Sequence, residues 1–206
     1  MTGVQTCALP ISEITPVTVK GRSGDIVVSI DEGPGKVKHE KISTLKPAFK
    51  KDGTITAASS SSINDGAAAL VLARESTAKE LGAKPMARIV GHATFAQEPE
   101  WFTTAPVGAV NKLLKKIGWN ARDVDLWEVN EAFAVVPMAA MKELGISHDI
   151  VNVNGGACAL GHPIGASGAR IIVTLMYALK ARGLRKGIAT LCIGGGEGTA
   201  LAIEII

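Results

Sequence analysis

From residue 84 onward, apolar runs of strand length alternate with segments of helical periodicity, and this alternation constrains the fold more than any other feature. The apolar runs predict buried strands over 84–96, 123–130, 149–155, 187–196 and 199–206. The segments between them predict helices over 105–119, 131–145 and 165–183. Strands that are apolar throughout need cover on both faces, so this order predicts an α/β fold in which helices and a sheet form layers. The last two strands follow each other directly and are expected as an antiparallel hairpin, and Pro137 is expected to bend its helix.

Residues 13–63 are polar, irregular and rich in glycine and proline, with short strands expected over 17–20 and 25–30. The pattern changes at residue 64, where a turn and a buried strand within 64–73 precede a short predicted helix over 74–82. The first twelve residues, MTGVQTCALPIS, differ from the rest and read like translated adapter DNA. We therefore treat residues 1–12 as a non-native artefact and leave them, with Cys7, out of the fold prediction.

The composition bounds the classes of partner. Of the 206 residues, 47% are hydrophobic, which is enough for one or two packed domains. A net charge of +3 with 20% charged residues indicates no nucleic-acid partner, and 4% aromatic residues argue against stacking on bases or sugars. We expect no membrane span, because no apolar run reaches roughly 18 residues. Three cysteines without metal-ligand spacing predict a reduced, cytoplasmic protein with no metal site, and a pI near 8.8 suits an anionic small ligand.

Three predicted strand ends carry residues that can take part in catalysis, and sites in α/β sheets form where such ends meet loops. The first is Asn130 in VNEAFA (129–134), between a strand and a helix. Asparagine is a common helix N-cap, which is one interpretation of this residue. The other interpretation is an amide that positions water or an oxyanion at the start of the helix.

The second strand end leads into GGACALGHPIGASGAR (155–170), where His162 is surrounded by small residues. Small residues let a ligand or another backbone approach closely, and the following helix start offers free N–H groups. The imidazole is therefore a candidate general base or hydrogen-bond donor to an oxyanion. The alternative is a histidine with a structural role in a turn. A phosphate-binding loop is excluded because its Lys-Ser/Thr pair is absent.

The third strand end is TLCIGGGEG (190–198), where Cys192 precedes three glycines. Glycines can expose backbone N–H groups, which is how an oxyanion hole is built. A buried cysteine usually behaves as a small hydrophobic residue, which is the alternative for Cys192. For Cys158 this second interpretation is the better one.

Together, NEAF, then GGxxxLGHPxGASGAR, then LCIGGGEG, in that order on an α/β chain, are specific. The sequence resembles the C-terminal half of a thiolase, from LKPAF (45–49) to the end, including KKDGTITAASSSSINDGAAALVL (50–72). The resemblance implies a thiolase-like layered α-β-α fold. It assigns residues 13–63 to the end of the loop domain, 64–83 to a re-entry into the N-terminal core, and 84–206 to the C-terminal domain.

The resemblance also implies an activity. Thiolases are acyltransferases of fatty acid metabolism that interconvert two acyl-CoA molecules, such as acetyl-CoA, with a 3-ketoacyl-CoA, such as acetoacetyl-CoA, and free CoA. The condensing direction is a Claisen condensation. By this resemblance His162 activates the nucleophilic cysteine, Cys192 is the second acid/base, and Asn130 holds the water that forms one oxyanion hole with His162. The amide of Gly194 contributes to the other oxyanion hole.

For binding, the resemblance assigns Ser61 to a contact with the pantetheine arm of CoA, and Ala132 and Phe133 to the walls of its tunnel. Coenzyme A is then a substrate, with no permanently bound cofactor, and the full-length enzyme is expected as a homodimer or homotetramer. The nucleophilic cysteine of thiolases has no counterpart in this sequence, so we expect the chain alone to be inactive. Two alternatives remain: a non-catalytic acyl-CoA-binding half-protein, and a ketoacyl-synthase-like condensing enzyme, in which a cysteine at position 192 is not expected.

Overall fold

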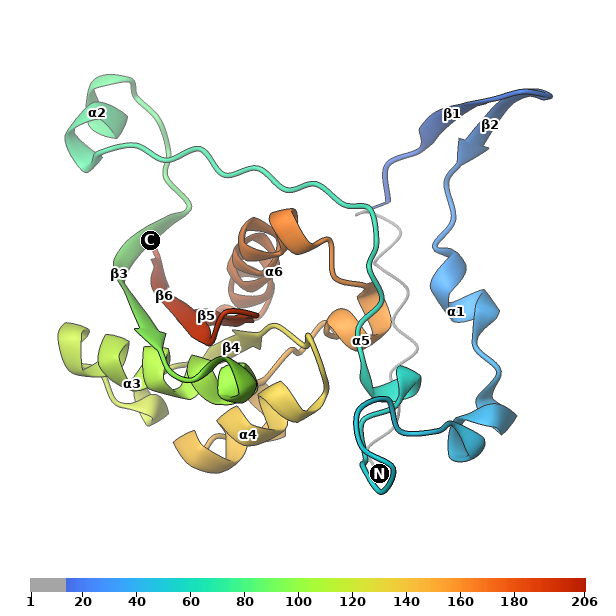
Figure 1. Ribbon diagram of the computed structural model, residues 1–206. Coiled ribbons are helices and arrows are strands. Elements are labelled where there is room, and N and C mark those ends of the chain that lie inside the picture. The colour runs from blue at the N-terminus through green and yellow to red at the C-terminus, as the bar shows by residue number, and fades with distance from the viewer. Residues whose placement is uncertain (1–13) are drawn as a thin grey trace.

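The computed structural model describes residues 14–206, so the interpretation of residues 1–12 and Cys7 falls outside the described range. The first described strands, β1 (Val17–Gly21) and β2 (Gly24–Val28), pair as an antiparallel hairpin. This confirms the two short strands predicted in the polar amino-terminal part. Both strands are exposed along their whole length, and Figure 1 shows the hairpin standing away from the sheet of the second half.

A four-stranded mixed sheet forms the centre of the second half, with the strand order β3-β6-β5-β4. Its members are β3 (Ala87–Ala96), β4 (Leu126–Val129), β5 (Lys186–Ile193) and β6 (Glu197–Ile205). Strands β4 and β5 run parallel, whereas β6 is antiparallel to both β5 and β3. The predicted hairpin of the last two strands is therefore confirmed.

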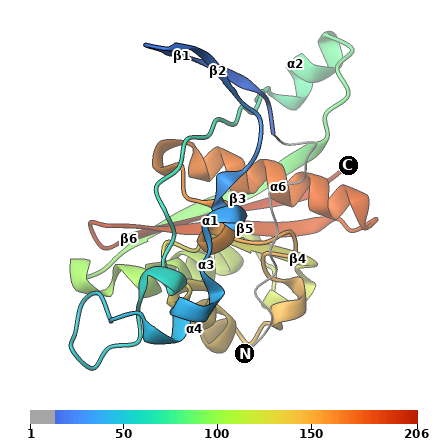
Figure 2. The ribbon, with the colours of Figure 1, turned by 90° about the vertical axis from the view of Figure 1, so that its right-hand side faces the viewer.

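Helices cover both faces of this sheet, which confirms the layered α/β fold. Figure 2 shows α6 (Ser167–Ala181) on one face and α3 (Ala105–Ile117) with α4 (Val135–Leu144) on the other. Three shorter helices lie in the connections: α1 (Glu32–Lys36), α2 (Glu75–Glu80) and α5 (Ala157–Leu160).

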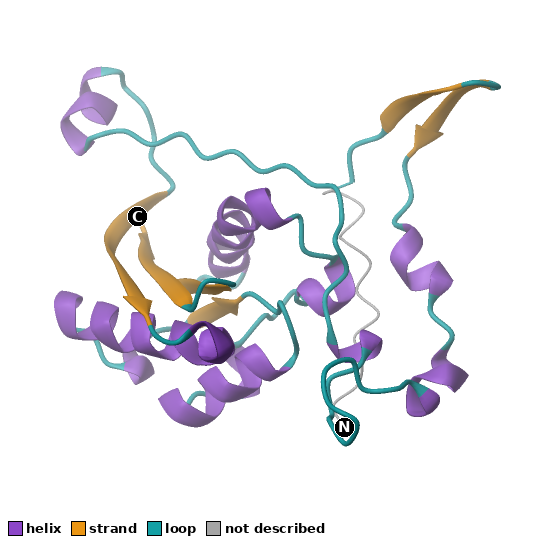
Figure 3. Cartoon of the chain, viewed as in Figure 1, coloured by secondary structure: helices purple, strands orange, loops and turns teal. Residues whose placement is uncertain are grey.

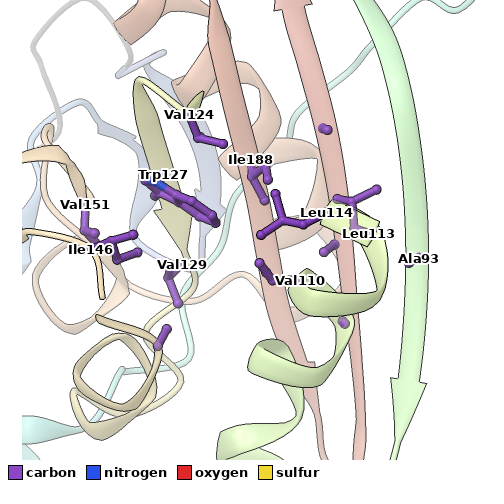
Figure 4. Close-up of a cluster of buried hydrophobic side chains, with 14 of the residues drawn as sticks. Ala93, Val110, Leu113, Leu114, Val124, Trp127, Val129, Ile146, Val151 and Ile188 are labelled. Atoms are coloured by element: carbon purple, nitrogen blue, oxygen red, sulfur yellow. The ribbon is translucent and has the colours of Figure 1, made fainter. Parts of the chain in front are cut away.

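Each face of the sheet has its own hydrophobic core. On the α3 and α4 face, Trp127 of β4 and Ile188 of β5 are fully buried against side chains such as Leu113 (Figure 4). On the α6 face, Ile171 and Leu175 belong to a second buried cluster. The two clusters explain why β4 and the middle of β5 are almost wholly buried, because successive side chains point to opposite faces and each face has a core, whereas the edge strand β3 keeps several exposed residues.

The run Ile164–Ala181, which contains α6, is apolar enough by length and composition to cross a membrane, with a mean hydropathy of 1.2. The expectation that no run reaches this length was wrong on that criterion. Helices that pack in a protein core pass the same test. Burial of one face of α6 against the sheet accounts for its composition.

Three local predictions are corrected. Residues 64–73 form no strand: Figure 3 shows a loop there, and Val71 is 99% exposed, because within the described residues no neighbouring strand pairs with this segment. Residues 149–155 contribute only a single bridge, between Val151 and Trp127, because Asn152 adopts a left-handed φ of 49°. Pro137 lies in the first turn of α4, where no intrahelical N–H bond is lost, so it does not bend the helix.

Candidate active site

Three segments far apart in the sequence meet beyond the end of β4. The backbone N–H of Ser61 donates to the carbonyl of Ala132 over 3.1 Å, and the N–H of His162 donates to the carbonyl of Ser62 over 2.8 Å. Gly161 lets the segments approach, because a Cβ there would lie 2.4 Å from Cγ of Asn64. The serine run (59–62) is thus hydrogen-bonded both to the NEAF loop (130–133) and to the loop that carries His162.

Asn130 and His162 are brought together by this arrangement. The Asn130 amide nitrogen Nδ2 lies 3.4 Å from Nε2 of His162, and the backbone N–H of Asn130 is held by the carbonyl of Thr190 over 2.9 Å. The Asn130 side chain is 1% exposed and its Oδ1 has no hydrogen-bond partner in the described chain. Helix α4 begins at Val135, so the interpretation of Asn130 as a helix cap is wrong.

The second nitrogen of His162 contacts a residue that sequence analysis missed. Nδ1 lies 2.5 Å from Oγ of Ser167, which is fully buried at the start of α6. With the Asn130 amide donating through Nδ2, Nε2 must accept, so Nδ1 carries the proton and donates to Ser167. Burial, and secondarily the charge of Arg170, lowers the pKa of His162 and keeps the ring neutral as a base near pH 7.

Cys192 lies near the end of β5, at the same end of the sheet as Asn130. Val129 is paired with Thr190 in the parallel ladder, and Cys192 follows two residues later on the same face of β5. The thiol is 7% exposed, and burial raises its pKa to about 11. Gly194 lies in the exposed turn after β5, and a Cβ there would have no atom within 4 Å, so the space beside its Cα is open.

The residues expected to contact pantetheine lie together and are themselves joined. Oγ of Ser61 donates to the carbonyl of Ala132 over 3.0 Å. The ring of Phe133 makes edge contacts with Phe49, at a centroid distance of 5.6 Å, and with Phe102, at 6.2 Å. These contacts bring Ser61, Ala132 and Phe133 into one wall, and their contact with a ligand stays a prediction.

Glu131 and Asn152 are two further residues that sequence analysis missed. The Glu131 carboxylate accepts from Nδ2 of Asn152 over 2.9 Å and from the backbone N–H of Cys158 over 3.0 Å. Burial and the nearby Glu131 charge raise the pKa of the Cys158 thiol to about 12, which agrees with a packing role for Cys158. The sequence feature that could have indicated Glu131 is its position directly after Asn130 in NEAF.

The chemistry of this arrangement is that of proton transfer beside hydrogen-bond donors. It offers a neutral imidazole, a buried amide with an unpartnered oxygen, and a thiol that holds its proton at neutral pH. Within residues 14–206 there is no group of three or more His, Cys, Asp or Glu side chains that could hold a metal ion.

Comparisons with known proteins give the family of the chain. The family model of the thiolase C-terminal domain matches residues 83–205, and that of the thiolase N-terminal domain matches residues 11–76. An acetyl-CoA acetyltransferase from Syntrophomonas wolfei is 50% identical over 196 residues, which cover 94% of this chain and 50% of that protein.

Solved structures give the same result. The acetyl-CoA acetyltransferase of Bacillus anthracis superimposes with a TM-score of 0.88 at 49% identity, covering 95% of this chain and 50% of that one. A thiolase from Ascaris suum in complex with coenzyme A superimposes with a TM-score of 0.80 at 43% identity, covering 92% of this chain and 49% of that one. The chain spans about half the length of the relatives it matches. With its C-terminal family model matched over more than half of its residues, the chain belongs to the thiolase family.

Proposed function

We propose that this chain forms the C-terminal half of the active site of an acetyl-CoA acetyltransferase. The reaction interconverts two acyl-CoA molecules, acetyl-CoA in the first place, with a 3-ketoacyl-CoA and free CoA. The observation that carries the proposal is the contact between Nδ2 of Asn130 and Nε2 of His162, at the same sheet edge as Cys192. The names of the relatives and the coenzyme A bound to the Ascaris suum thiolase support the substrate class.

In this proposal His162 is the first base. Its unprotonated Nε2 takes the proton of a nucleophilic cysteine, which we assign to the half of the relatives that this chain does not span. The cysteine sulfur then bonds to the thioester carbon, the bond from that carbon to the sulfur of CoA breaks, and the CoA thiolate takes up a proton. A neutral imidazole suits this step, because it is already free to accept.

Cys192 is the proposed second acid/base. The first cysteine is acylated when the α-carbon of the second acyl-CoA loses its proton, so another base is needed. The raised pKa of Cys192, about 11, makes its thiolate a strong base once formed and lets its thiol return a proton during cleavage.

Two sets of donors stabilise the oxygens that become negative. Asn130 holds a water that, with His162, forms one oxyanion hole, and the amide of Gly194, in an exposed turn, contributes to the other. The unpartnered, buried Oδ1 of Asn130 supports the water, since a buried amide oxygen needs a partner. Ser61, Ala132 and Phe133 form the wall for the pantetheine arm.

We further propose the division into the end of the loop domain (13–63), a re-entry segment (64–83) and the C-terminal domain (84–206). The break between the two family models, after residue 76 and before residue 83, supports it. A cytoplasmic location, a role in fatty acid metabolism and a homodimer or homotetramer of the full-length enzyme belong to the same proposal.

The test is a hybrid in which residues 14–206 replace the matching half of the Bacillus anthracis enzyme. We expect thiolysis of acetoacetyl-CoA, and a loss of kcat/KM of about 100-fold to 10,000-fold on His162→Ala. The exposed His148 provides the control, since His148→Ala leaves the rate unchanged. A hybrid that folds but shows no thiolysis, or a His162→Ala variant as fast as its parent, would contradict the proposal.

A further inference from the structure

We propose that Asn152 is a positioning residue that holds the NEAF loop so that Asn130 faces His162. Its importance for turnover rests on the function proposed above, whereas the positioning itself rests only on contacts within this chain. Asn152 lies outside the three motifs that suggested the site. Within residues 14–206 it makes no hydrogen bond to Asn130 or His162, and it bonds instead to the residues on either side of Asn130.

The outer side of Val129, the residue before Asn130, is bound by the Asn152 side chain. Oδ1 of Asn152 accepts from the N–H of Val129 over 2.8 Å, and Nδ2 donates to the carbonyl of Val129 over 2.8 Å. Strand β4 is the edge strand of its sheet, so among the described residues no further strand supplies these two bonds. The amide group of Asn152 therefore takes the place of a strand neighbour at the last residue of β4.

The residue after Asn130 is held by the same amide. The remaining hydrogen of Nδ2 donates to Oε1 of Glu131 over 2.9 Å, while Oε2 of Glu131 accepts from the N–H of Cys158 over 3.0 Å. Asn152 thereby uses its acceptor and both donor hydrogens. Asn130 sits between two anchored neighbours, and its own N–H is bound by the carbonyl of Thr190 over 2.9 Å.

The backbone conformation of Asn152 indicates that this position needs the side-chain amide of asparagine. Its φ of 49° makes it the one non-glycine residue with positive φ in the described chain. Glycine adopts such a conformation at lower cost than asparagine. A residue chosen for the backbone alone would be glycine, so the side-chain bonds to Val129 and Glu131 explain the asparagine. Strained backbone of this kind collects at functional sites.

The experiment labels histidines of this chain with diethyl pyrocarbonate, which acylates the unprotonated imidazole, and measures the rate at each histidine by peptide mass spectrometry. Asn152→Gly keeps the backbone conformation and removes only the amide. Asn152→Asp is the second variant, because it keeps the acceptor for Val129 N–H but cannot donate. Asn154→Gly is the matched control: it removes an amide from the same loop, bonded to Arg182.

We expect the His162 rate to rise about tenfold in both Asn152 variants, through local opening of the loop, and to stay unchanged in Asn154→Gly. The exposed His92 and His148 report on general unfolding and should not change. An unchanged His162 rate in the Asn152 variants, an equal rise in Asn154→Gly, or an equal rise at His92 and His148 would each overturn the positioning role.

In the hybrid enzyme described above, Asn152→Gly is expected to lower kcat about 100-fold with little change in KM, as a misplacement of about 1 Å does. An unchanged kcat, with His162 labelling raised, would overturn the role of Asn152 in turnover. If the unsubstituted hybrid has no activity, the proposed function fails instead, and the labelling rates still decide whether Asn152 positions the loop.

Discussion

Replacing Gly156 by alanine tests whether the Glu131 carboxylate is held as the structure shows. A Cβ at residue 156 would lie 2.1 Å from Cδ of Glu131 and 2.2 Å from its Oε1. The carboxylate cannot simply turn away, because Asn152 and the N–H of Cys158 bind its two oxygens at 2.9 and 3.0 Å. The backbone itself, with φ −125° and ψ −178°, accepts alanine without strain.

The magnitude follows from these contacts. Overpacking of a filled site costs about 1–3 kcal/mol. Displacing the carboxylate instead costs about 1.5–3 kcal/mol for a hydrogen bond to a charged group. Replacing glycine in an allowed conformation returns about 0.4–1 kcal/mol through the unfolded state. We expect Gly156→Ala to lower the free energy of unfolding by about 1–2 kcal/mol, which is the middle of the range left when the returned term is subtracted from either cost.

The assay is urea denaturation followed by circular dichroism, in a double-mutant cycle with Glu131→Ala. Removing the carboxylate creates room for the new methyl group, so Gly156→Ala should cost about 1 kcal/mol less in that background. Gly168→Ala is the control, because a Cβ there meets no atom within 4 Å and alanine favours a helix. A Gly156→Ala variant within about 0.5 kcal/mol of its parent, or an equal cost in both backgrounds, would refute the reasoning.

Three further predictions follow from the site. The pKa of His162 in the folded state lies below its ordinary 6.5, because burial and Arg170 disfavour the charged ring. Below pH 6.5 the unfolded chain therefore binds more protons than the folded chain. The folded state loses stability as the pH falls from 6.5 through the lower pKa of the folded state. A His162→Gln variant should lose this part of the pH dependence in urea titrations at pH 5 to 8, and an unaltered profile would count against it. Cys192 and Cys158, with pKa values raised to about 11 and about 12, should react with iodoacetamide at pH 8 far more slowly than a free thiol; labelling of either residue in the native chain, located by peptide mass spectrometry, at the rate of a short cysteine peptide would contradict this. The purified chain should show no thiolysis of acetoacetyl-CoA, since Cys192 is buried, Cys158 is half-buried, and the raised pKa values keep both thiols protonated; turnover that is lost on His162→Ala would show that it needs no further cysteine.

The polar network around Asn130 gives the site its rigidity. Backbone bonds from Thr190 and side-chain bonds from Asn152 and Glu131 fix a loop that carries no regular secondary structure. A loop held at this many points loses little entropy when substrate binds, and its donors need not reorganise during the reaction. Most of these bonds join residues more than 20 positions apart in the sequence.

The sequence by itself determined the layered α/β fold and the hairpin of β5 and β6, because apolar periodicity and glycine turns act over a few residues. It also singled out Asn130, His162 and Cys192, because polar residues at the ends of apolar runs are visible in a linear pattern. Only the tertiary structure decided that residues 64–73 stay extended and exposed, since a strand needs a neighbour to pair with. Ser167 beside His162, and Asn152 beside Val129, were likewise decided by packing, because contacts between distant segments leave no periodic signal along the chain.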